Sequence, residues 1–284
     1  MSHSCAIIAG SGAFPLHVAG EAKRQGLTVV GIGLQGWVDP TLAQHVDAYE
    51  EIAVGQLGHL IERLKAHHTT HAVMAGKVTK DVLFDARARF DAAALGILGQ
   101  VTDFSVNSLL GAIAGRLAED GITLLDSSTF LKEHLCPAGV LTTRRPTPSD
   151  AQEIQLGARV ARQLAEWDIG QTVVVKQRVI VAVEALEGTD AAITRAAQLA
   201  GRDLVIVKMA SPQQDMRFDL PVLGRESVAV AAAAGAACVA VEAGKTLLLD
   251  KDALIARANE ANLCLVGLEF PKPVSTHPED ADDR

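Results

Sequence analysis

Short apolar runs alternate with amphipathic segments along the first half of the chain. The apolar runs are rich in Val, Ile and Ala and are typical of buried strands, while the segments between them carry apolar residues at helical spacing. We therefore expect strands at residues 6–9, 28–34, 49–54, 71–75 and 122–125, and helices at 15–25, 56–66, 81–98 and 104–118. Strands that alternate with helices in this way predict a parallel, Rossmann-like sheet with helices on its faces.

The second half of the chain shows both patterns again, with one difference. Two β-branched runs, 172–175 and 179–183, flank the short polar segment Lys176-Gln177-Arg178 and predict a hairpin. Further strands are expected at 204–207, 238–242, 246–249 and 263–268, and helices at 150–167, 189–199, 226–235 and 251–262. A hairpin among strands that alternate with helices predicts a second α/β domain with a mixed sheet.

The two halves are separated by the segment Thr142-Thr143-Arg144-Arg145-Pro146-Thr147-Pro148-Ser149. Its two prolines and clustered hydroxyl side chains oppose regular structure, so we interpret 142–149 as a linker. It divides the chain into an N-terminal Rossmann-like domain at 1–141 and a C-terminal α/β domain at 150–270. Residues 271–284 hold prolines and acids with almost nothing to bury, and we expect a disordered tail there.

Composition excludes several classes of function. A chain of 284 residues with 49% hydrophobic residues can build genuine cores, whereas a net charge of -8 without a basic run disfavours nucleic acid as a partner. The four cysteines share no close spacing, so we expect reduced, buried thiols and a cytoplasmic protein.

No basic segment precedes the first apolar run, so we expect no secretory signal. The longest weakly apolar stretch, 227–241, is too short to span a bilayer, which needs about 20 apolar residues, so any membrane contact would be peripheral.

Two features at strand ends of the first domain favour phosphate binding. Gly10-Ser11-Gly12 follows the first strand and precedes a helix, so backbone N–H groups can approach an anion near the helix N-terminus. Lys77 follows the strand 71–75, at the edge where open α/β sheets bind ligands, although it could equally be a surface cation. A dinucleotide is disfavoured, because Pro15 stands at the third glycine of the G-x-G-x-x-G fingerprint and Gln35 stands where an acid is needed.

Charged side chains gather at strand ends of the second domain. Glu184, Glu187 and Asp190 follow the hairpin, and Lys208 ends the strand 204–207. The next loop adds Gln213, Gln214, Asp215, Arg217 and Asp219. One interpretation is structural, with acids that begin a helix capped by Thr189 and a loop that is solvated and ion-paired. Taken together, however, acids, cations and amides at neighbouring strand ends are the mixture that binds a divalent cation and a phosphate.

Five segments of the chain carry a family resemblance. They are Ile7-Ile8-Ala9-Gly10-Ser11-Gly12, Ala75-Gly76-Lys77-Val78, Asp168-Ile169-Gly170-Gln171, Ala182-Val183-Glu184-Ala185-Leu186-Glu187-Gly188-Thr189-Asp190 and Gln214-Asp215-Met216-Arg217-Phe218-Asp219-Leu220-Pro221. The Glu-Gly-Thr-Asp and Gln-Asp-x-Arg-Phe-Asp blocks are the specific part. With these segments the chain, from residue 5 to about 268, resembles the LpxI-type UDP-2,3-diacylglucosamine pyrophosphatases.

The resemblance implies an activity and an assembly. The activity is hydrolysis of UDP-2,3-diacylglucosamine to 2,3-diacylglucosamine 1-phosphate (lipid X) and UMP, a magnesium-dependent step of lipid A synthesis. The assembly is a homodimer, with or without exchanged domains. We accordingly expect 150–270 to be the catalytic domain of a cytoplasmic enzyme, with peripheral contact at the cytoplasmic face of the inner membrane.

The candidate site residues fall into three groups. We expect substrate binding by Gly10, Ser11, Gly12, Lys77, Gln171, Thr189 and Gln214. We expect Mg²⁺ to be held by Asp215, Asp219 and Glu187. For catalysis we expect Asp215 as metal ligand or base, Asp190 in support, and Arg217 and Lys208 stabilising the charge of the pentacoordinate phosphorus.

Three other functions remain open on the sequence. An NAD-dependent oxidoreductase is opposed by Pro15 and Gln35. A non-catalytic sugar-nucleotide sensor would leave the acids between residues 187 and 219 without a use. A phosphoryl-transfer enzyme that acts on a soluble sugar nucleotide would carry the same charged loops, so the sequence does not separate it from an enzyme that acts on a lipid-linked substrate.

Overall fold

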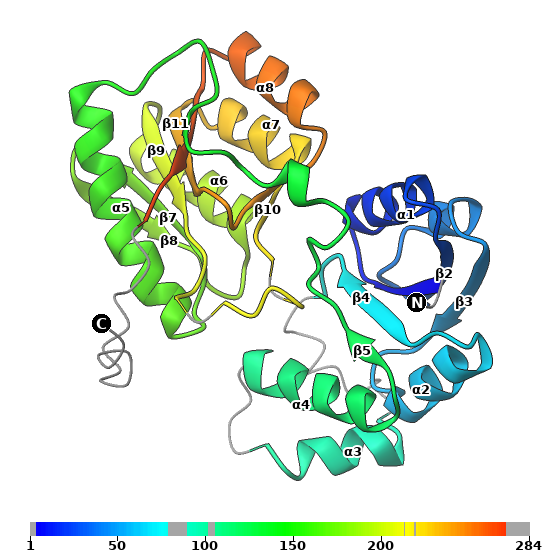
Figure 1. Ribbon diagram of the computed structural model, residues 1–284. Coiled ribbons are helices and arrows are strands. Elements are labelled where there is room, and N and C mark those ends of the chain that lie inside the picture. The colour runs from blue at the N-terminus through cyan, green and yellow to red at the C-terminus, as the bar shows by residue number, and fades with distance from the viewer. Residues whose placement is uncertain (1–3, 79–89, 102–105, 213, 219, 271–284) are drawn as a thin grey trace, which may run out of the picture.

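The protein consists of two α/β units (Figure 1). The computed structural model describes residues 4–78, 90–101, 106–212, 214–218 and 220–270. Each unit is a sheet with helices on its faces, and the chain leaves the first sheet after β5 (Thr123–Leu124) and enters the second at β6 (Gly139–Val140). The predicted two-domain α/β architecture is confirmed.

The first sheet is parallel, as the sequence predicts. Its strands lie in the order β3-β2-β1-β4-β5, and every pairing is parallel. The strands before β5 are β1 (Ser4–Ala9), β2 (Thr28–Leu34), β3 (Ala48–Ile52) and β4 (His71–Ala75), and the helices are α1 (Phe14–Arg24), α2 (Leu57–Ala66), α3 (Ala92–Leu98) and α4 (Val106–Glu119). Of the predicted helices 81–98 and 104–118, residues 81–89 and 104–105 lie outside the described residues. The described part of the first is α3, which Asp91 caps by accepting from the Ala94 N–H.

The second sheet is mixed, again as predicted. Its order is β6-β13-β11-β9-β7-β8, with β9, β11 and β13 parallel and β7 antiparallel to both of its neighbours. Gln177 and Arg178 have positive φ angles of 49° and 62°, the conformation that a two-residue hairpin turn requires. The remaining elements are β7 (Thr172–Lys176), β8 (Val179–Val183), β9 (Leu204–Lys208), β11 (Ala236–Glu242), β13 (Cys264–Leu268), α5 (Pro148–Glu166), α6 (Thr189–Ala200), α7 (Arg225–Ala233) and α8 (Lys251–Glu260).

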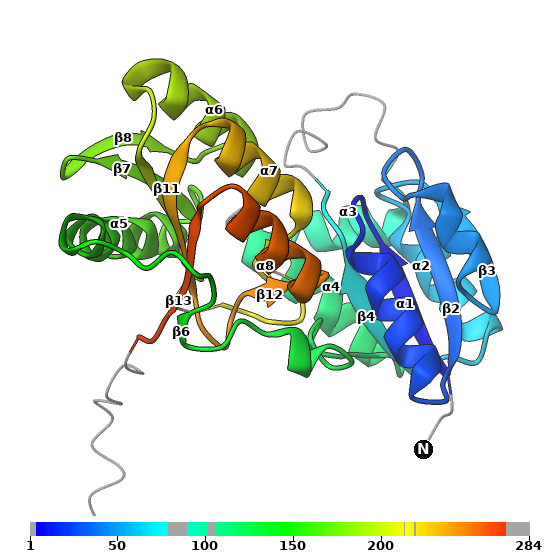
Figure 2. The ribbon, with the colours of Figure 1, turned by 90° about the horizontal axis from the view of Figure 1, so that it is seen from above.

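Helices cover both faces of this second sheet (Figures 1 and 2). Ile154 and Ala161 of α5 pack against Val173 and Val207 on one face. On the other face, Ile193 of α6 lies in one buried cluster with residues of α7 and α8. Both faces of β9 and β11 are therefore buried, which explains why these strands read as continuous apolar runs rather than as alternating ones.

A short segment of the second half, which contains β12, packs against the first domain. β10 (Val222–Leu223) and β12 (Leu247–Leu248) form a separate two-stranded parallel sheet, although the sequence places 246–249 among the main strands. Leu247 and Leu249 are buried with Ile7 and Val18 in a core of the first domain. The two domains thus share apolar packing in addition to their covalent connection.

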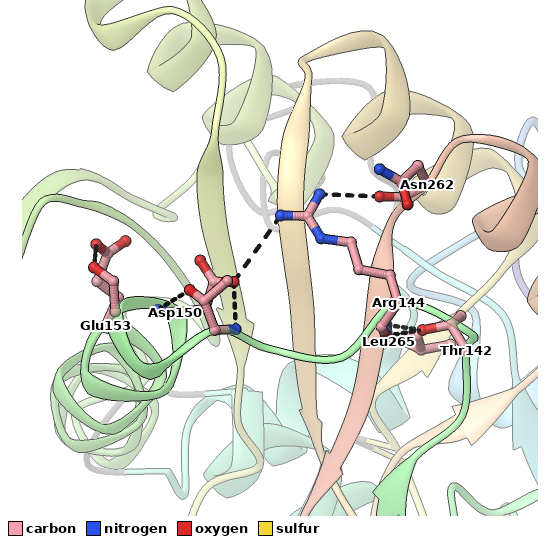
Figure 3. Close-up of polar contacts among 8 residues, drawn as sticks. Thr142, Arg144, Asp150, Glu153, Asn262 and Leu265 are labelled. Atoms are coloured by element: carbon pink, nitrogen blue, oxygen red, sulfur yellow. Dashed lines mark hydrogen bonds and ion pairs between the residues drawn. The ribbon is translucent and has the colours of Figure 1, made fainter.

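The segment predicted as a linker is held against the second sheet (Figure 3). The Thr142 hydroxyl accepts from the Leu265 N–H at 2.9 Å, and the Arg144 guanidinium donates to the Asn262 carbonyl at 3.0 Å. Val140 of β6 already pairs with β13, so the second sheet begins before residue 142. Helix α5 is capped by Thr147 in a capping box with Asp150.

Two further expectations concern cysteines and membrane spans. All four cysteines are buried and free, which confirms the prediction of reduced thiols. Among the described residues, every helix is too short or too polar to cross a bilayer.

Gly157 allows α5 to approach the sheet closely, and its substitution tests that packing. A Cβ at Gly157 would lie 2.6 Å from a methyl carbon of Val207 and 3.1 Å from one of Val175. We expect Gly157→Ala to lower the free energy of unfolding by about 1–3 kcal/mol, because stiff β-branched neighbours cannot move aside. Gly20→Ala, at an open position of α1, should instead raise it by about 0.5–1 kcal/mol. Equal urea midpoints for Gly157→Ala and wild type would contradict the close packing.

Ser127 joins the two domains, and this contact gives a second test. Its Oγ lies 2.7 Å from both the Met74 carbonyl of β4 and the Arg217 carbonyl, and its N–H donates to the Met216 carbonyl at 2.8 Å. Ser127→Ala should therefore loosen the loop around Arg217, since a buried carbonyl without its donor costs about 1–3 kcal/mol.

Limited trypsin digestion measures that loosening as the rate of cleavage after Arg217. Ser128→Ala is the matched control, because Ser128 is equally buried but its hydroxyl bonds to Asp126 within the same turn. We expect faster cleavage in Ser127→Ala and wild-type cleavage in Ser128→Ala. Similar digestion of all three proteins would show that Ser127 does not hold the loop.

Candidate active site

A cavity of about 1510 Å³ lies between the two domains. In the first domain it is lined by residues that follow β1 and β4, including Gly10 and Lys77. In the second domain it is lined by residues after β8 and at the end of β9, including Glu184 and Lys208. In open α/β sheets, ligands bind in a crevice at the carboxyl ends of the strands, and this cavity is in that position.

The glycine loop and the Lys77 segment interlock at the cavity wall. The Ser11 N–H donates to the Lys77 carbonyl at 2.9 Å, and the Lys77 N–H donates back to the Ser11 carbonyl at 3.0 Å. A Cβ at Gly10 would lie 2.7 Å from the Lys77 carbonyl oxygen, and Gly76 has a φ of 92°. Glycine is required at both positions because no side chain fits between the two backbones. The structure therefore brings Gly10, Ser11, Gly12 and Lys77 together at the cavity wall.

The Lys77 amine reaches across the cavity to the start of α6. A Cβ at Gly188, the N-cap residue of α6, would lie 3.1 Å from Lys77 Nζ. The sequence suggested Thr189 as the cap, but Gly188 occupies that position with a φ of 84° and Thr189 is the first helical residue. A second cation lies at the same helix end, because Lys208 Nζ donates to the Thr189 hydroxyl at 3.0 Å. Two lysines and a helix N-terminus converge here, an arrangement suited to a phosphate.

Glu184 lies beside these lysines, and sequence alone gives it no specific role. Its Oε1 accepts from the Thr189 hydroxyl at 2.9 Å, and its Oε2 accepts from the Gln171 N–H at 3.3 Å. Burial of the carboxyl opposes ionisation, but the charge of Lys208 and the hydrogen bonds from Thr172, Thr189 and Gln171 together hold the pKa of Glu184 below its usual range. Glu184 is thus an ionised carboxylate with several donors around it.

Glu187 and Asp190 also line the cavity, near the first turn of α6. Glu187 forms an ion pair of 2.6 Å with Arg195. The hydrogen bond from Arg195 is the main reason that the pKa of Glu187 lies below its usual range. Asp190 is in the first helical turn, where a negative charge is favoured by the helix dipole. The structural interpretation and the functional one are therefore compatible for these two acids.

The loop after β9 is arranged differently from the cavity wall. Asp215 and Arg217 form a bidentate pair, with the guanidinium Nη2 2.6 Å from Oδ2 and Nε 2.9 Å from Oδ1. Hydrogen bonding from Arg217 lowers the pKa of Asp215. Gln214 accepts from the Ser211 N–H at 2.7 Å through its side-chain oxygen. Asp215, Arg217 and Gln214 are not among the described residues that line the cavity, and Asp219 lies outside the described residues.

The fit to a metal ion depends on how many protein ligands the ion needs. Within the described parts of the chain, no group of three or more His, Cys, Asp or Glu side chains is placed to hold a metal. Magnesium, however, usually keeps several waters and binds one or two carboxylates together with substrate phosphates. Glu184, Glu187 and Asp190 provide carboxylate oxygens on the cavity wall, which is the donor type that Mg²⁺ prefers.

The other end of the cavity is apolar. It is lined by side chains of α2, α3 and α4, namely Leu57, Leu60, Ala94, Ile97, Leu98, Leu109, Leu110 and Ile113, together with Phe90 and Phe218. The sequence alone does not locate this region. Leu109, Leu110 and Ile113 are only partly buried. The sequence feature that points to this region is therefore an apolar face of α4 that is larger than the sheet beneath it can cover.

Comparisons with known proteins agree with this architecture. The family model described as the LpxI N-terminal domain matches residues 4–134, and that of the LpxI C-terminal domain matches residues 137–266. The chain is also similar to the UDP-2,3-diacylglucosamine pyrophosphatase LpxI of Caulobacter vibrioides. The two are 30% identical over 275 residues, which cover 93% of this chain and 96% of the relative.

Two solved structures with some likeness are biotin carboxylases. The biotin carboxylase subunit of pyruvate carboxylase gives a TM-score of 0.27 at 15% identity, over 72% of this chain and 44% of that chain. The biotin carboxylase domain of Hydrogenobacter thermophilus 2-oxoglutarate carboxylase gives 0.27 at 13% identity, over 70% of this chain and 43% of that chain. Both TM-scores are below 0.5, so neither structure informs the fold or function of this chain.

The boundary between the two family models falls at residues 134–137, immediately before β6 enters the second sheet. The two models together leave out only a few residues of the two-domain unit that encloses the cavity. From these matches and the relative that extends over nearly its whole length, the chain belongs to the LpxI family.

Proposed function

We propose that the protein hydrolyses the pyrophosphate bond of UDP-2,3-diacylglucosamine, giving 2,3-diacylglucosamine 1-phosphate (lipid X) and UMP in lipid A biosynthesis. The observation that carries the proposal is the two-part cavity. One end has Lys77, Lys208 and the α6 N-terminus, and the other is lined by apolar side chains of α2, α3 and α4. A substrate with a pyrophosphate and two acyl chains matches both ends, and the LpxI relative is named for this substrate.

Within this proposal, the chain's own residues position and neutralise the pyrophosphate. Lys77 and Lys208 offer ammonium groups from opposite walls, and the α6 N-terminus adds its dipole. Bound Mg²⁺ would be held by Asp190 and Glu187, with Asp215 and Asp219 as further candidates, and would neutralise charge on the phosphates. Asp215 and Arg217 are the proposed catalytic pair, with Asp190 and Lys208 in support.

The proposal also includes the setting of the enzyme. We propose a cytoplasmic homodimer that contacts the inner membrane peripherally, because the substrate is lipid-linked and no described helix could span the bilayer. An apolar cavity end that opens toward a membrane surface would let acyl chains enter without passing through water.

Turnover in oxygen-18 water tests the reaction and the bond that breaks. Attack of water on the sugar-side phosphorus makes UMP the leaving group, so we expect the label in the lipid phosphate, measured by mass spectrometry. Label in UMP would overturn that choice of phosphorus. Turnover of UDP-N-acetylglucosamine without turnover of the diacyl substrate would favour an enzyme of soluble sugar nucleotides, and binding of UDP without any turnover would favour a sensor.

Asp215→Ala tests the proposed catalytic carboxylate. We expect kcat to fall by about 10²–10⁴ at saturating magnesium, with the fold and substrate binding largely kept, since such a group acts mainly in the transition state. Asp219→Ala is the comparison, because two metal ligands would both raise the magnesium requirement. An Asp215→Ala enzyme that keeps more than about a tenth of wild-type kcat, and loses melting temperature instead, would assign Asp215 only to its ion pair with Arg217.

A further inference from the structure

On the cavity wall that the second domain forms, three polar side chains from three different elements are linked by hydrogen bonds. Lys208 ends β9, Thr189 begins α6 and Glu184 follows β8. Lys208 Nζ donates to the Thr189 hydroxyl at 3.0 Å, and the same hydroxyl lies 2.9 Å from Glu184 Oε1. All three residues line the cavity. β7 lies between β8 and β9 in the sheet, so these hydrogen bonds connect residues at the ends of two strands that are not neighbours.

The direction of these hydrogen bonds follows from the chemistry of the groups. An ionised carboxylate can only accept and an ammonium group can only donate. The Thr189 hydroxyl must therefore give its proton to Glu184 and receive one from Lys208. Each group in the chain fixes the orientation of the next, and the contact with Thr189 takes one of the three donors that the ammonium has.

Glu184 is itself anchored from several sides. Its backbone N–H donates to the Thr172 carbonyl at 2.8 Å, and its Oε2 accepts from the Gln171 N–H. Gly170 passes so close that a Cβ there would lie 2.2 Å from the Glu184 carbonyl oxygen. A carboxylate held this firmly suits the orientation of a neighbour better than proton transfer, which requires a group free to approach the substrate.

We propose that Glu184 is a positioning residue that acts through Thr189 to hold the Lys208 ammonium group in the cavity, where it binds the substrate pyrophosphate. This inference rests on the proposed function for the identity of the substrate. It concerns phosphate binding at Lys208, and so extends to any ligand with a diphosphate in this cavity. Loss of the Glu184 charge leaves Lys208 without its orienting partner, whereas loss of Lys208 leaves Glu184 with nothing to orient.

A double-mutant cycle in the full chain tests the proposal. We expect Glu184→Gln and Lys208→Ala each to lower kcat/KM by about 10- to 100-fold, the usual range for a hydrogen bond to a charged group. Combined, they should be no worse than Lys208→Ala alone, because Glu184 acts through Lys208. Thr189→Val should match Glu184→Gln, and Thr189→Ser, which restores the hydroxyl, should recover most of the activity.

Several outcomes would overturn this relay, the hydrogen-bonded link from Glu184 through Thr189 to Lys208. Independent multiplication of the Glu184→Gln and Lys208→Ala effects would make Glu184 a separate catalytic or metal-binding group. Full activity of Thr189→Val would remove the link between the two. Glu119→Gln, an exposed charge loss at the end of α4, is the control and should leave kcat/KM unchanged.

Binding of UDP, measured by calorimetry, separates failure of the relay from failure of the proposed function. If the wild type does not turn over UDP-2,3-diacylglucosamine, the proposed function fails, yet the relay still predicts that Glu184→Gln and Thr189→Val weaken UDP binding to the same extent as Lys208→Ala. Wild-type UDP affinity in Glu184→Gln would overturn the relay whatever the reaction is. Should Glu184→Gln fold poorly, the Thr189→Val and Thr189→Ser pair decides the matter by the same measurement.

Discussion

The cavity depends on the apolar packing that the two domains share. Leu247 and Leu249 come from the second half of the chain, yet they are buried among Ile7 and Val18 of the first domain. Burial of a leucine side chain stabilises by about 1.5–3 kcal/mol, so parting the domains would expose a costly surface. The walls are thereby held at a spacing that lets Lys77 of one domain reach the first turn of α6 in the other. Without this shared core, far less buried surface would hold the two halves of the site together.

The charge pattern of the cavity follows from that spacing. The protein carries a net charge of -8, so an anionic ligand is attracted only where cations are concentrated locally. Lys77 and Lys208 supply this concentration beside the positive end of α6, while two acids of the same wall, Glu184 and Glu187, accept from donors of their own. Arg195 neutralises Glu187, and Thr189, Thr172 and Gln171 surround Glu184. The wall can therefore be rich in carboxylates and still receive a pyrophosphate.

Regular elements were predictable from the sequence because their patterns are local. The hairpin 172–183 was predicted correctly from two β-branched runs and a polar turn, and the structure has positive φ angles at that turn. β10 and β12 were not recognised as a separate sheet, because strands of two residues have no periodicity. The link from Glu184 to Lys208 was also missed, because it depends on the order β9-β7-β8, which sequence spacing does not encode. The apolar end of the cavity likewise depends on how three helices meet.

Composition of a loop identifies its charged groups but not which of them face a ligand. The sequence predicts separate catalytic roles for Asp215 and Arg217, whereas the structure pairs their side chains through hydrogen bonds of 2.9 and 2.6 Å. A phosphate offers the guanidinium the same fork of acceptors that a carboxylate offers. Under the proposed function, a pyrophosphate that reached Arg217 would compete with Asp215 for the guanidinium group. The ion pair between these two proposed catalytic groups thus keeps each charge compensated until a ligand replaces one partner.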